Sequence, residues 1–168
     1  MMFRRIEDLV ETWKTESEFT EKQLRVLTDA SLNTAIADGH RTIGRIAWHI
    51  AQTIPEMGGR TGMKLEGPGE KEAVPQSAAE ILKAYQAAAQ SLLQQVSANW
   101  SDETLEVEDD MYGMNWKRGL TMAALVKHEV HHRGQLTVLM RQAGLPVGGI
   151  YGPSKEEWSA YNMPAPEI

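Results

Sequence analysis

The chain has 168 residues, of which 42% are hydrophobic and 24% are charged, and its formal net charge is −6. This size and composition are typical of one globular domain with its own core, so we expect a single domain over residues 1–168. The absence of cysteine excludes a thiol nucleophile, a cysteine-ligated metal and a disulfide framework.

The charge and hydropathy patterns argue against two further classes of protein. The 17 lysines and arginines are scattered along the chain, so no basic face for nucleic acid is expected. No apolar stretch approaches the roughly 18 residues of a membrane span, and the first residues do not form a signal-peptide pattern. We therefore expect a cytoplasmic protein that is not inserted in a membrane.

Two helices are predicted in the first part of the chain. The first covers residues 3–28, where apolar residues recur at helical spacing around a polar middle. After a break of small and polar residues, the second opens with Thr42 as its N-cap and ends near Met57. The spacing of its apolar residues is that of a buried helix face: Ile43, Ile46, Ala47, Ile50 and Ile54.

The third predicted helix follows a loop rich in glycine and charge. Ser77 and Glu80 form a capping-box pattern at its start, and the apolar periodicity ends near Trp100. Residues 105–117 are expected to form a small hairpin or an ordered loop.

The fourth predicted helix covers residues 120–143 and ends at Gly144. In the tail beyond it, we expect one short helix over residues 155–159 with Ser154 as its cap. Four amphipathic helices with almost no strand predict an all-α four-helix bundle.

Three of the five histidines fall within the stretch KHEVHHRGQL of the fourth helix. His128 and His132 continue the row of Met122, Leu125, Leu136, Leu139 and Met140, so both imidazoles are expected to face the core. His49 lies beside the buried stripe of the second helix. It stands roughly 10 Å into that helix, against roughly 12 and 18 Å for His128 and His132 in theirs. The three imidazoles can therefore meet between two adjacent helices.

Several interpretations of these histidines are open from spacing alone. A zinc protease with the pattern H-E-x-x-H would need Glu129 as general base and a third ligand downstream, and it usually needs a sheet that this sequence lacks. A di-iron site needs a second Glu-x-x-His motif, which is absent. A mononuclear site of three histidines and water fits the spacing. Hydrogen-bonded packing residues remain the alternative, because unpartnered buried imidazoles are costly.

The stretches TIGRIAWHIAQ (42–52) and LVKHEVHHRGQLTVLMRQAGLP (125–146) resemble the two signatures of the DinB-like (DinB/YfiT-type) metalloenzyme family. The tail YGPSKEEW is also similar to these proteins, and the resemblance covers essentially the whole chain. It implies an up-down-down-up four-helix bundle in which His49, His128 and His132 match the three metal-ligand positions.

The resemblance also implies a chemistry. Proteins of this type bind a divalent ion, often zinc or nickel, and many are homodimers. Characterised relatives include transferases that use low-molecular-weight thiols, so a small-molecule substrate and a transferase or hydrolase reaction are expected. The alternative is a non-catalytic, metal-stabilised bundle that binds a small molecule or a protein partner.

Other residues around the motif are candidates for supporting roles. Glu129 is a candidate general base, although a surface charge is the favoured interpretation, and His131 is expected at the pocket edge rather than as a fourth ligand. Gly134 is expected to permit close contact between helices. The remaining candidates could orient ligands, pair with neighbouring helices or line a pocket: Trp48, Tyr112, Met114, Trp116, Arg133 and Gln135.

Overall fold

The computed structural model describes residues 2–167 and contains four long helices. They are α1 (Ile6–Leu24), α2 (Ile43–Gly59), α3 (Ala78–Asn99) and α4 (Arg118–Gln142). Within the described residues the only sheet has two strands, so the predicted all-α class is confirmed. No helix in this part of the chain is long and apolar enough to cross a membrane.

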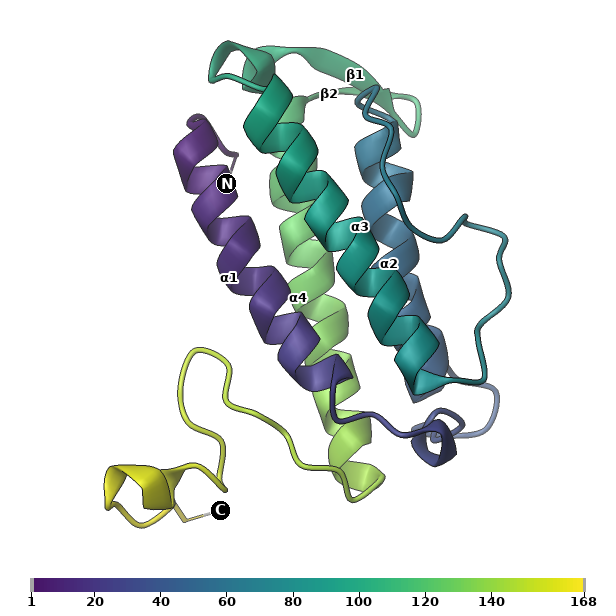
Figure 1. Cartoon of the computed structure of the whole chain (residues 1–168), viewed down its shortest axis with the longest axis vertical. Helices are drawn as coiled ribbons and strands as arrows, with labels where there is room; N and C mark the ends of the chain where they lie inside the picture. The colour runs from purple at the N-terminus through teal and green to yellow at the C-terminus, as the bar shows by residue number, and fades with distance from the viewer. Residues whose placement is uncertain (1, 168) are drawn as a thin grey trace.

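The helices form a bundle in which α2 packs against α3 and α4, and α1 packs against the same two helices. In Figure 1, α1 and α4 run downward, whereas α2 and α3 run upward. The loop over residues 60–77 returns along the length of the bundle to join α2 to α3. The contact between α2 and α4 matters most below, because each of these helices carries histidines.

Side-chain caps explain where α2 and α3 begin. The Thr42 hydroxyl accepts a hydrogen bond from the backbone N–H of Arg45 (3.1 Å), and the Ser77 hydroxyl accepts one from the N–H of Glu80 (3.4 Å). The N-caps Thr42 and Ser77 are therefore confirmed, but the predicted capping box is only half formed, because within the described residues the Glu80 side chain does not accept the N–H of Ser77.

The first helix is shorter than predicted. A carboxylate oxygen of Asp102 accepts the N–H of Ile6 (2.7 Å), which fixes the start of α1 from a distant part of the chain. At the other end, Thr28 and Ser31 form a capping box that begins a separate 3₁₀ turn, η1 (Asp29–Ser31). Asp102 is far from α1 in the sequence, so periodicity alone could not place the start of this helix.

A hairpin fills the predicted stretch before the last helix. After the 3₁₀ turn η2 (Glu103–Glu106), strands β1 (Glu108–Met111) and β2 (Met114–Lys117) pair antiparallel, with Glu108 opposite Lys117. The two turn residues, Tyr112 and Gly113, have φ of 59° and 83°, as a two-residue hairpin turn requires. Helix α4 starts directly after β2, two residues earlier than predicted.

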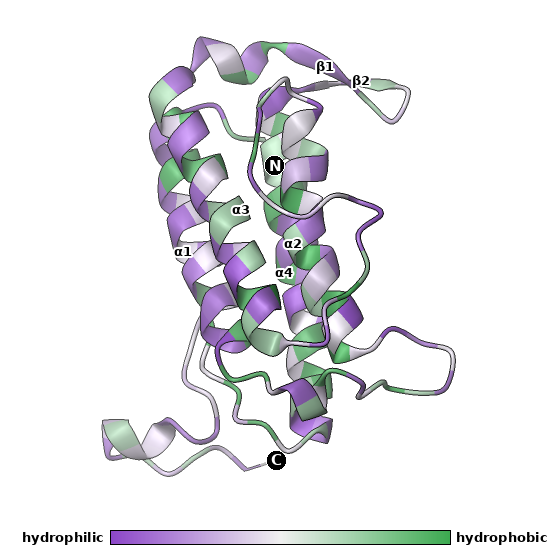
Figure 2. Cartoon of the chain, turned by 45° about the vertical axis from the view of Figure 1, so that its right-hand side comes forward, coloured by the Kyte–Doolittle hydropathy of each residue, from purple (hydrophilic) through white to green (hydrophobic). Residues whose placement is uncertain are grey.

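The core lies between the four helices, and Figure 2 shows hydrophobic and hydrophilic residues alternating around them. Burial of these side chains from water is the main stabilising contribution. The predicted stripe of α4 is buried, as are the stripes of the other helices: Leu9, Trp13, Ile43, Ile50, Ile54, Ile81, Leu92, Met122, Leu125, Leu136, Leu139 and Met140.

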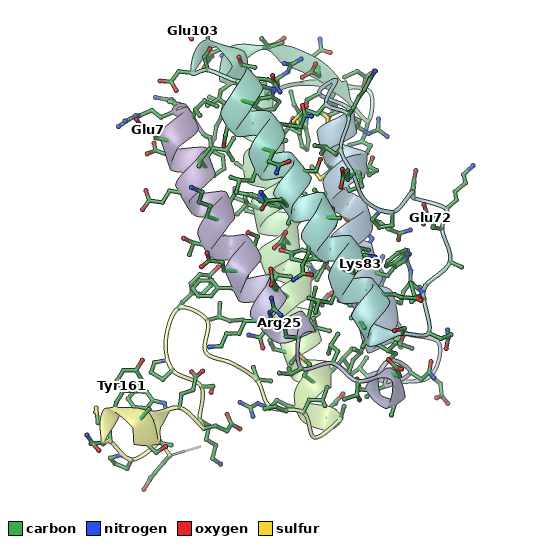
Figure 3. The ribbon with its side chains drawn as sticks, in the orientation of Figure 1. Glu7, Arg25, Glu72, Lys83, Glu103 and Tyr161 are labelled. Atoms are coloured by element: carbon green, nitrogen blue, oxygen red, sulfur yellow. The ribbon has the colours of Figure 1, made fainter. Side chains whose placement is uncertain are left out.

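The short tail helix is displaced from its predicted position. A 3₁₀ turn, η3, covers Trp158–Tyr161, and Figure 3 shows Tyr161 on this turn, apart from the four long helices. The Ser154 hydroxyl does not act as a cap. Instead, the Glu157 carboxylate accepts the backbone N–H groups of Gly149 (3.0 Å) and Ser154 (2.9 Å), which holds this segment as a loop.

Candidate metal centre

The three predicted histidines come together between α2 and α4. One ligand nitrogen from each of His49, His128 and His132 lies within 4.8 Å of the other two. The ring centroids are 4.4–5.0 Å apart, and the Nε2 atoms of His128 and His132 are separated by 3.1 Å. The four-residue spacing on α4 and the packing of α2 against α4 together produce this convergence.

The hydrogen bonds of His132 indicate which of its nitrogens is free. Its Nδ1 lies 2.8 Å from the amide oxygen of Gln135, an acceptor, so Nδ1 carries the proton and Nε2 has the lone pair. The amide nitrogen of the same Gln135 donates to Nε2 of His131 (3.1 Å). Gln135 therefore fixes the tautomer and orientation of one of the clustered histidines, and His131 supports Gln135 from the exposed side.

All three clustered imidazoles favour the neutral form. Burial, followed by the charges of His132 and His128, lowers the pKa of His49 to about 4. Burial and then the charge of His132 lower the pKa of His128 to about 4, and burial also lowers that of His132. The positive charge of Arg41 acts in the same direction on each ring. Neutral imidazole is the form that binds a metal.

The donor set and spacing fit a divalent ion. Ligands about 2.0–2.1 Å from a tetrahedral ion stand roughly 3.3 Å from one another, close to the 3.1 Å between the two Nε2 atoms on α4. Without an ion, one of these nitrogens has to carry a proton and donate to the other. Nδ1 of His128 is buried and has no hydrogen-bond partner among the described residues. The three rings therefore do not form a self-satisfied packing cluster.

A pocket of about 390 Å³ opens beside His49. Tyr112, at the tip of the hairpin, lines it and donates a hydrogen bond to a Glu56 carboxylate oxygen (2.8 Å), while Arg60 stacks on its ring. Burial and the Glu56 carboxylate raise the pKa of Tyr112 to about 12. Of the predicted pocket residues, Tyr112 and Gln135 thus lie near the cluster.

The three other aromatic and sulfur-containing candidates lie elsewhere. Trp48 is buried on α2 and its indole N–H donates to the carbonyl of Glu72 (3.1 Å), so it anchors the long loop. Trp116 packs half-buried against the core, and Met114 is exposed on the hairpin. Gly134 does not mediate a close helix contact as predicted, because a Cβ there would meet nothing within 4 Å.

Glu129 is not a surface charge, and this expectation was wrong. Its side chain is buried, and one carboxylate oxygen accepts hydrogen bonds from Thr20 (2.6 Å) and Tyr85 (2.7 Å). Burial raises the pKa of Glu129 to about 7, against the opposing effect of these hydrogen bonds. Its neighbours Thr20 and Tyr85 belong to α1 and α3, whereas the clustered rings lie between α4 and α2. Spacing alone could not show which neighbouring helices would cover that side.

Arg133 belongs to the same buried network rather than to a pocket. It is 1% exposed and pairs with the Glu16 carboxylate of α1, and it also donates to the Glu16 carbonyl (2.8 Å). The hydroxyl of Tyr151, in the tail, contacts both Arg133 (2.8 Å) and Glu16 (2.8 Å). The prediction that Arg133 could pair with a neighbouring helix is confirmed.

Sequence reasoning missed Glu16 and Thr20, although a signal was present. Both are buried, and they continue the helical row of Leu9, Trp13 and Leu24 at spacings of three and four. Polar residues within an apolar stripe indicate a buried polar network rather than a solvated face.

The fold and site together define a class: an all-α bundle with three histidines on two helices that can hold a metal ion. The sequence profile of the DinB family matches residues 2–167, and the chain belongs to this family. It is 40% identical over 167 residues to the uncharacterized protein YrdA of Bacillus subtilis (strain 168), which covers 99% of this chain and 100% of YrdA.

Two solved structures have the same architecture. A DinB-like protein from Bacillus cereus ATCC 10987 is 42% identical, with a TM-score of 0.86 over 89% of this chain and 100% of that one. The DinB-like protein YjoA from Bacillus subtilis is 15% identical, with a TM-score of 0.69 over 88% of this chain and 99% of that one. The second comparison shows the fold alone.

Proposed function

We propose that this protein is a divalent-metal-dependent enzyme of the transferase type, using a low-molecular-weight thiol, or of the hydrolase type. The observation that carries the proposal is the convergence of His49, His128 and His132 on one point beside a pocket. Zinc and nickel are the favoured ions, because imidazole is a good ligand for both.

The number of ligands favours a catalytic site over a structural one. Structural zinc sites usually close all four positions with protein side chains, whereas catalytic sites keep one position for water or substrate. In the described residues the ligand set is three histidines, and His49 is only half-buried and lines the adjoining pocket. An ion held there would act as a Lewis acid that favours the anionic form of a water or thiol molecule.

The residues of the chain would hold and orient the reactants. The imidazoles bind the ion, and Gln135 holds His132 in the correct tautomer through the 2.8 Å hydrogen bond to Nδ1. Any sulfur nucleophile would have to come from outside, because the chain has no cysteine. Glu129 is buried and accepts hydrogen bonds from Thr20 of α1 and Tyr85 of α3, so it is not proposed as general base.

The second candidate is a non-catalytic bundle that the metal stabilises for binding a small molecule or protein. The partial burial of the cluster favours it, because metal bound only to the folded state stabilises that state. A homodimer is part of both proposals on the family resemblance, and sedimentation velocity tests it.

The experiment begins with metal content. Protein loaded with zinc or nickel and then dialysed should contain about one ion per chain by elemental analysis. The variant His128→Ala should lose the ion, whereas the exposed His40→Ala should keep it. Full occupancy in His128→Ala would contradict the ligand assignment.

The reaction is tested next with the metal-loaded protein. A panel of low-molecular-weight thiols with electrophiles, and a parallel panel of hydrolysable amides and esters, should give metal-dependent turnover in one panel. The His128→Ala variant should have lost that turnover. Metal bound at full occupancy with no turnover in either panel would favour the non-catalytic bundle.

A further inference from the structure

An apolar pocket of about 420 Å³ is lined in part by Gln135, the hydrogen-bond partner of His132. Its walls come from α2, α4 and the segment before α2: Ile36, Ile46, Val138 and Leu139. Ile36 and Val138 are 59% and 52% exposed, so hydrophobic side chains from two elements face solvent across this space. Exposed apolar walls of this kind are typical of a ligand site.

The pocket is joined to the metal centre by Gln135. This residue lines the pocket and also bonds Nδ1 of His132, one of the three clustered histidines. A ligand in the pocket would therefore have one end against the apolar walls and the other near the histidines.

The end of the pocket next to Gln135 carries a positive charge. Arg41 lines the pocket together with Gln135, the hydrogen-bond partner of His132. Neither Arg41 nor Arg45, one turn further along, has a carboxylate within 4.0 Å in residues 2–167. Eight other lysines and arginines have such partners. In a chain of net charge −6, the Arg41 guanidinium, which lines this pocket and has no carboxylate partner in the described residues, favours an anion.

We propose that this pocket binds a small organic acid, with its anionic head group between Arg41 and the metal centre and its apolar body against Ile36, Ile46, Val138 and Leu139. The inference deepens the proposed function, on which it rests, by naming the class of substrate. No carboxylate lines this pocket, whereas the pocket beside His49 contains Glu56 and Glu70. An acid is therefore better accommodated on the Arg41 side.

The test uses zinc-loaded full-length protein and isothermal titration calorimetry. The probes are octanoate, octan-1-ol with the same chain length but no charge, and acetate with the same head group but no chain. Octanoate should bind at least about tenfold more tightly than either of the other two, because only it uses both features.

Two variants probe the two ends of the pocket, each with a matched control. Arg41→Gln should weaken octanoate binding about tenfold or more, while Arg4→Gln, at an exposed arginine near the other end of the bundle, should leave it unchanged. Val138→Asp should weaken it similarly, while Leu120→Asp, at an exposed position near the start of α4, should not.

Each contrary outcome has a distinct meaning. Equal binding of octanoate by the wild type and Arg41→Gln, or equal binding of octanoate and octanol, overturns the inference. If Val138→Asp changes the sedimentation coefficient and leaves octanoate binding intact, the apolar wall is an interface with a second copy and the inference is wrong. Failure of zinc to bind the histidines would instead overturn the proposed function.

Discussion

The polar side chains on the two faces of α4 differ in whether they satisfy one another. On the face toward α1 and α3, Arg133 is paired with Glu16, and one oxygen of Glu129 accepts two hydroxyl donors. On the face toward α2, the nitrogens of His128 and His132 face each other at 3.1 Å, with His49 nearby. One stretch of six residues, 128–133, supplies both sets.

The comparison shows how a structural polar cluster can be told from a binding site. Arg133 and Glu16 have opposite charges and satisfy one another, whereas Glu129 is satisfied at one oxygen only, because its Oε2 is buried without a partner among the described residues. Three neutral imidazoles converging on one point have lone pairs that other protein groups do not use, so they indicate a ligand. Four predictions test this distinction, beginning with the largest expected effect.

Breaking the buried ion pair between Arg133 and Glu16 should cause the largest loss of stability. Arg133→Met leaves Glu16 buried without its partner, and we expect it to lower the free energy of unfolding by about 3–5 kcal/mol. Arg141, on the same helix as Arg133, forms an exposed ion pair with Glu156 of the tail, and Arg141→Met should cost less than about 1 kcal/mol. Urea denaturation of the metal-free proteins measures both. Similar losses would mean that the interior pair is not a structural element.

The pH dependence of stability should report the protonation of the buried Glu129. Its pKa is raised from 4.5 to about 7 on folding, so its contribution is fully present below pH 4.5 and is lost as the pH rises through 7. The lost contribution is about 3–3.5 kcal/mol, because the rise from 4.5 to about 7 corresponds to about 1.36 kcal/mol for each pKa unit.

Glu129→Gln should remove this dependence, because glutamine stays neutral. The variant should gain stability relative to the wild type between pH 5 and pH 8 when the metal-free proteins are compared by urea denaturation. Glu18→Gln, at an exposed position of α1, is the control and should follow the wild type. Parallel curves for Glu129→Gln and the wild type would show that Glu129 is ionised throughout.

The hydrogen bond between His132 and Gln135 should make a smaller but measurable contribution to zinc affinity. Gln135→Ala removes the acceptor of its Nδ1 proton, and we expect zinc affinity to fall about 10- to 100-fold. The unfolding free energy of the metal-free protein should change little, since Gln135 is exposed. A competition titration with a chelator gives the affinity. An unchanged zinc affinity would show that Gln135 does not contribute to metal binding.

The acid sensitivity of metal binding should be unusually weak. The pKa values of His49 and His128 are lowered to about 4, so protons compete with the ion only as the pH approaches 4 rather than below about 6. Between pH 7 and pH 5 we expect these two rings to reduce zinc affinity by less than about twofold. Imidazoles with an ordinary pKa of about 6.5 would each cost roughly 30-fold at pH 5. A chelator titration across this range distinguishes the two cases.

The sequence predicted the site where local periodicity was sufficient. The four-residue spacing of His128 and His132 within the Leu125–Leu136 row placed both rings on one face, and the caps at Thr42 and Ser77 placed two helix starts. The contact of His49 with this pair depends on α2 and α4 being neighbours. That neighbourhood was predicted from the family resemblance.

What could not be predicted depends on contacts between distant segments. Glu129 is buried because α1 and α3 provide Thr20 and Tyr85, and α1 begins at Ile6 because Asp102 accepts its N–H. Helical periodicity describes one helix at a time and does not report the partner that turns a polar residue inward.

The tail after α4 has a role that its position outside the bundle conceals. Tyr151 is 68% exposed, yet its hydroxyl closes the outer end of the Arg133–Glu16 pair, and Lys22 and Gln23 of α1 bind the neighbouring backbone. The tail segment therefore covers the outer end of the buried Arg133–Glu16 ion pair. A shortened chain that ended at Val147 would contain all four long helices and the three clustered histidines, but it would lack the Tyr151 hydroxyl that contacts Arg133 and Glu16.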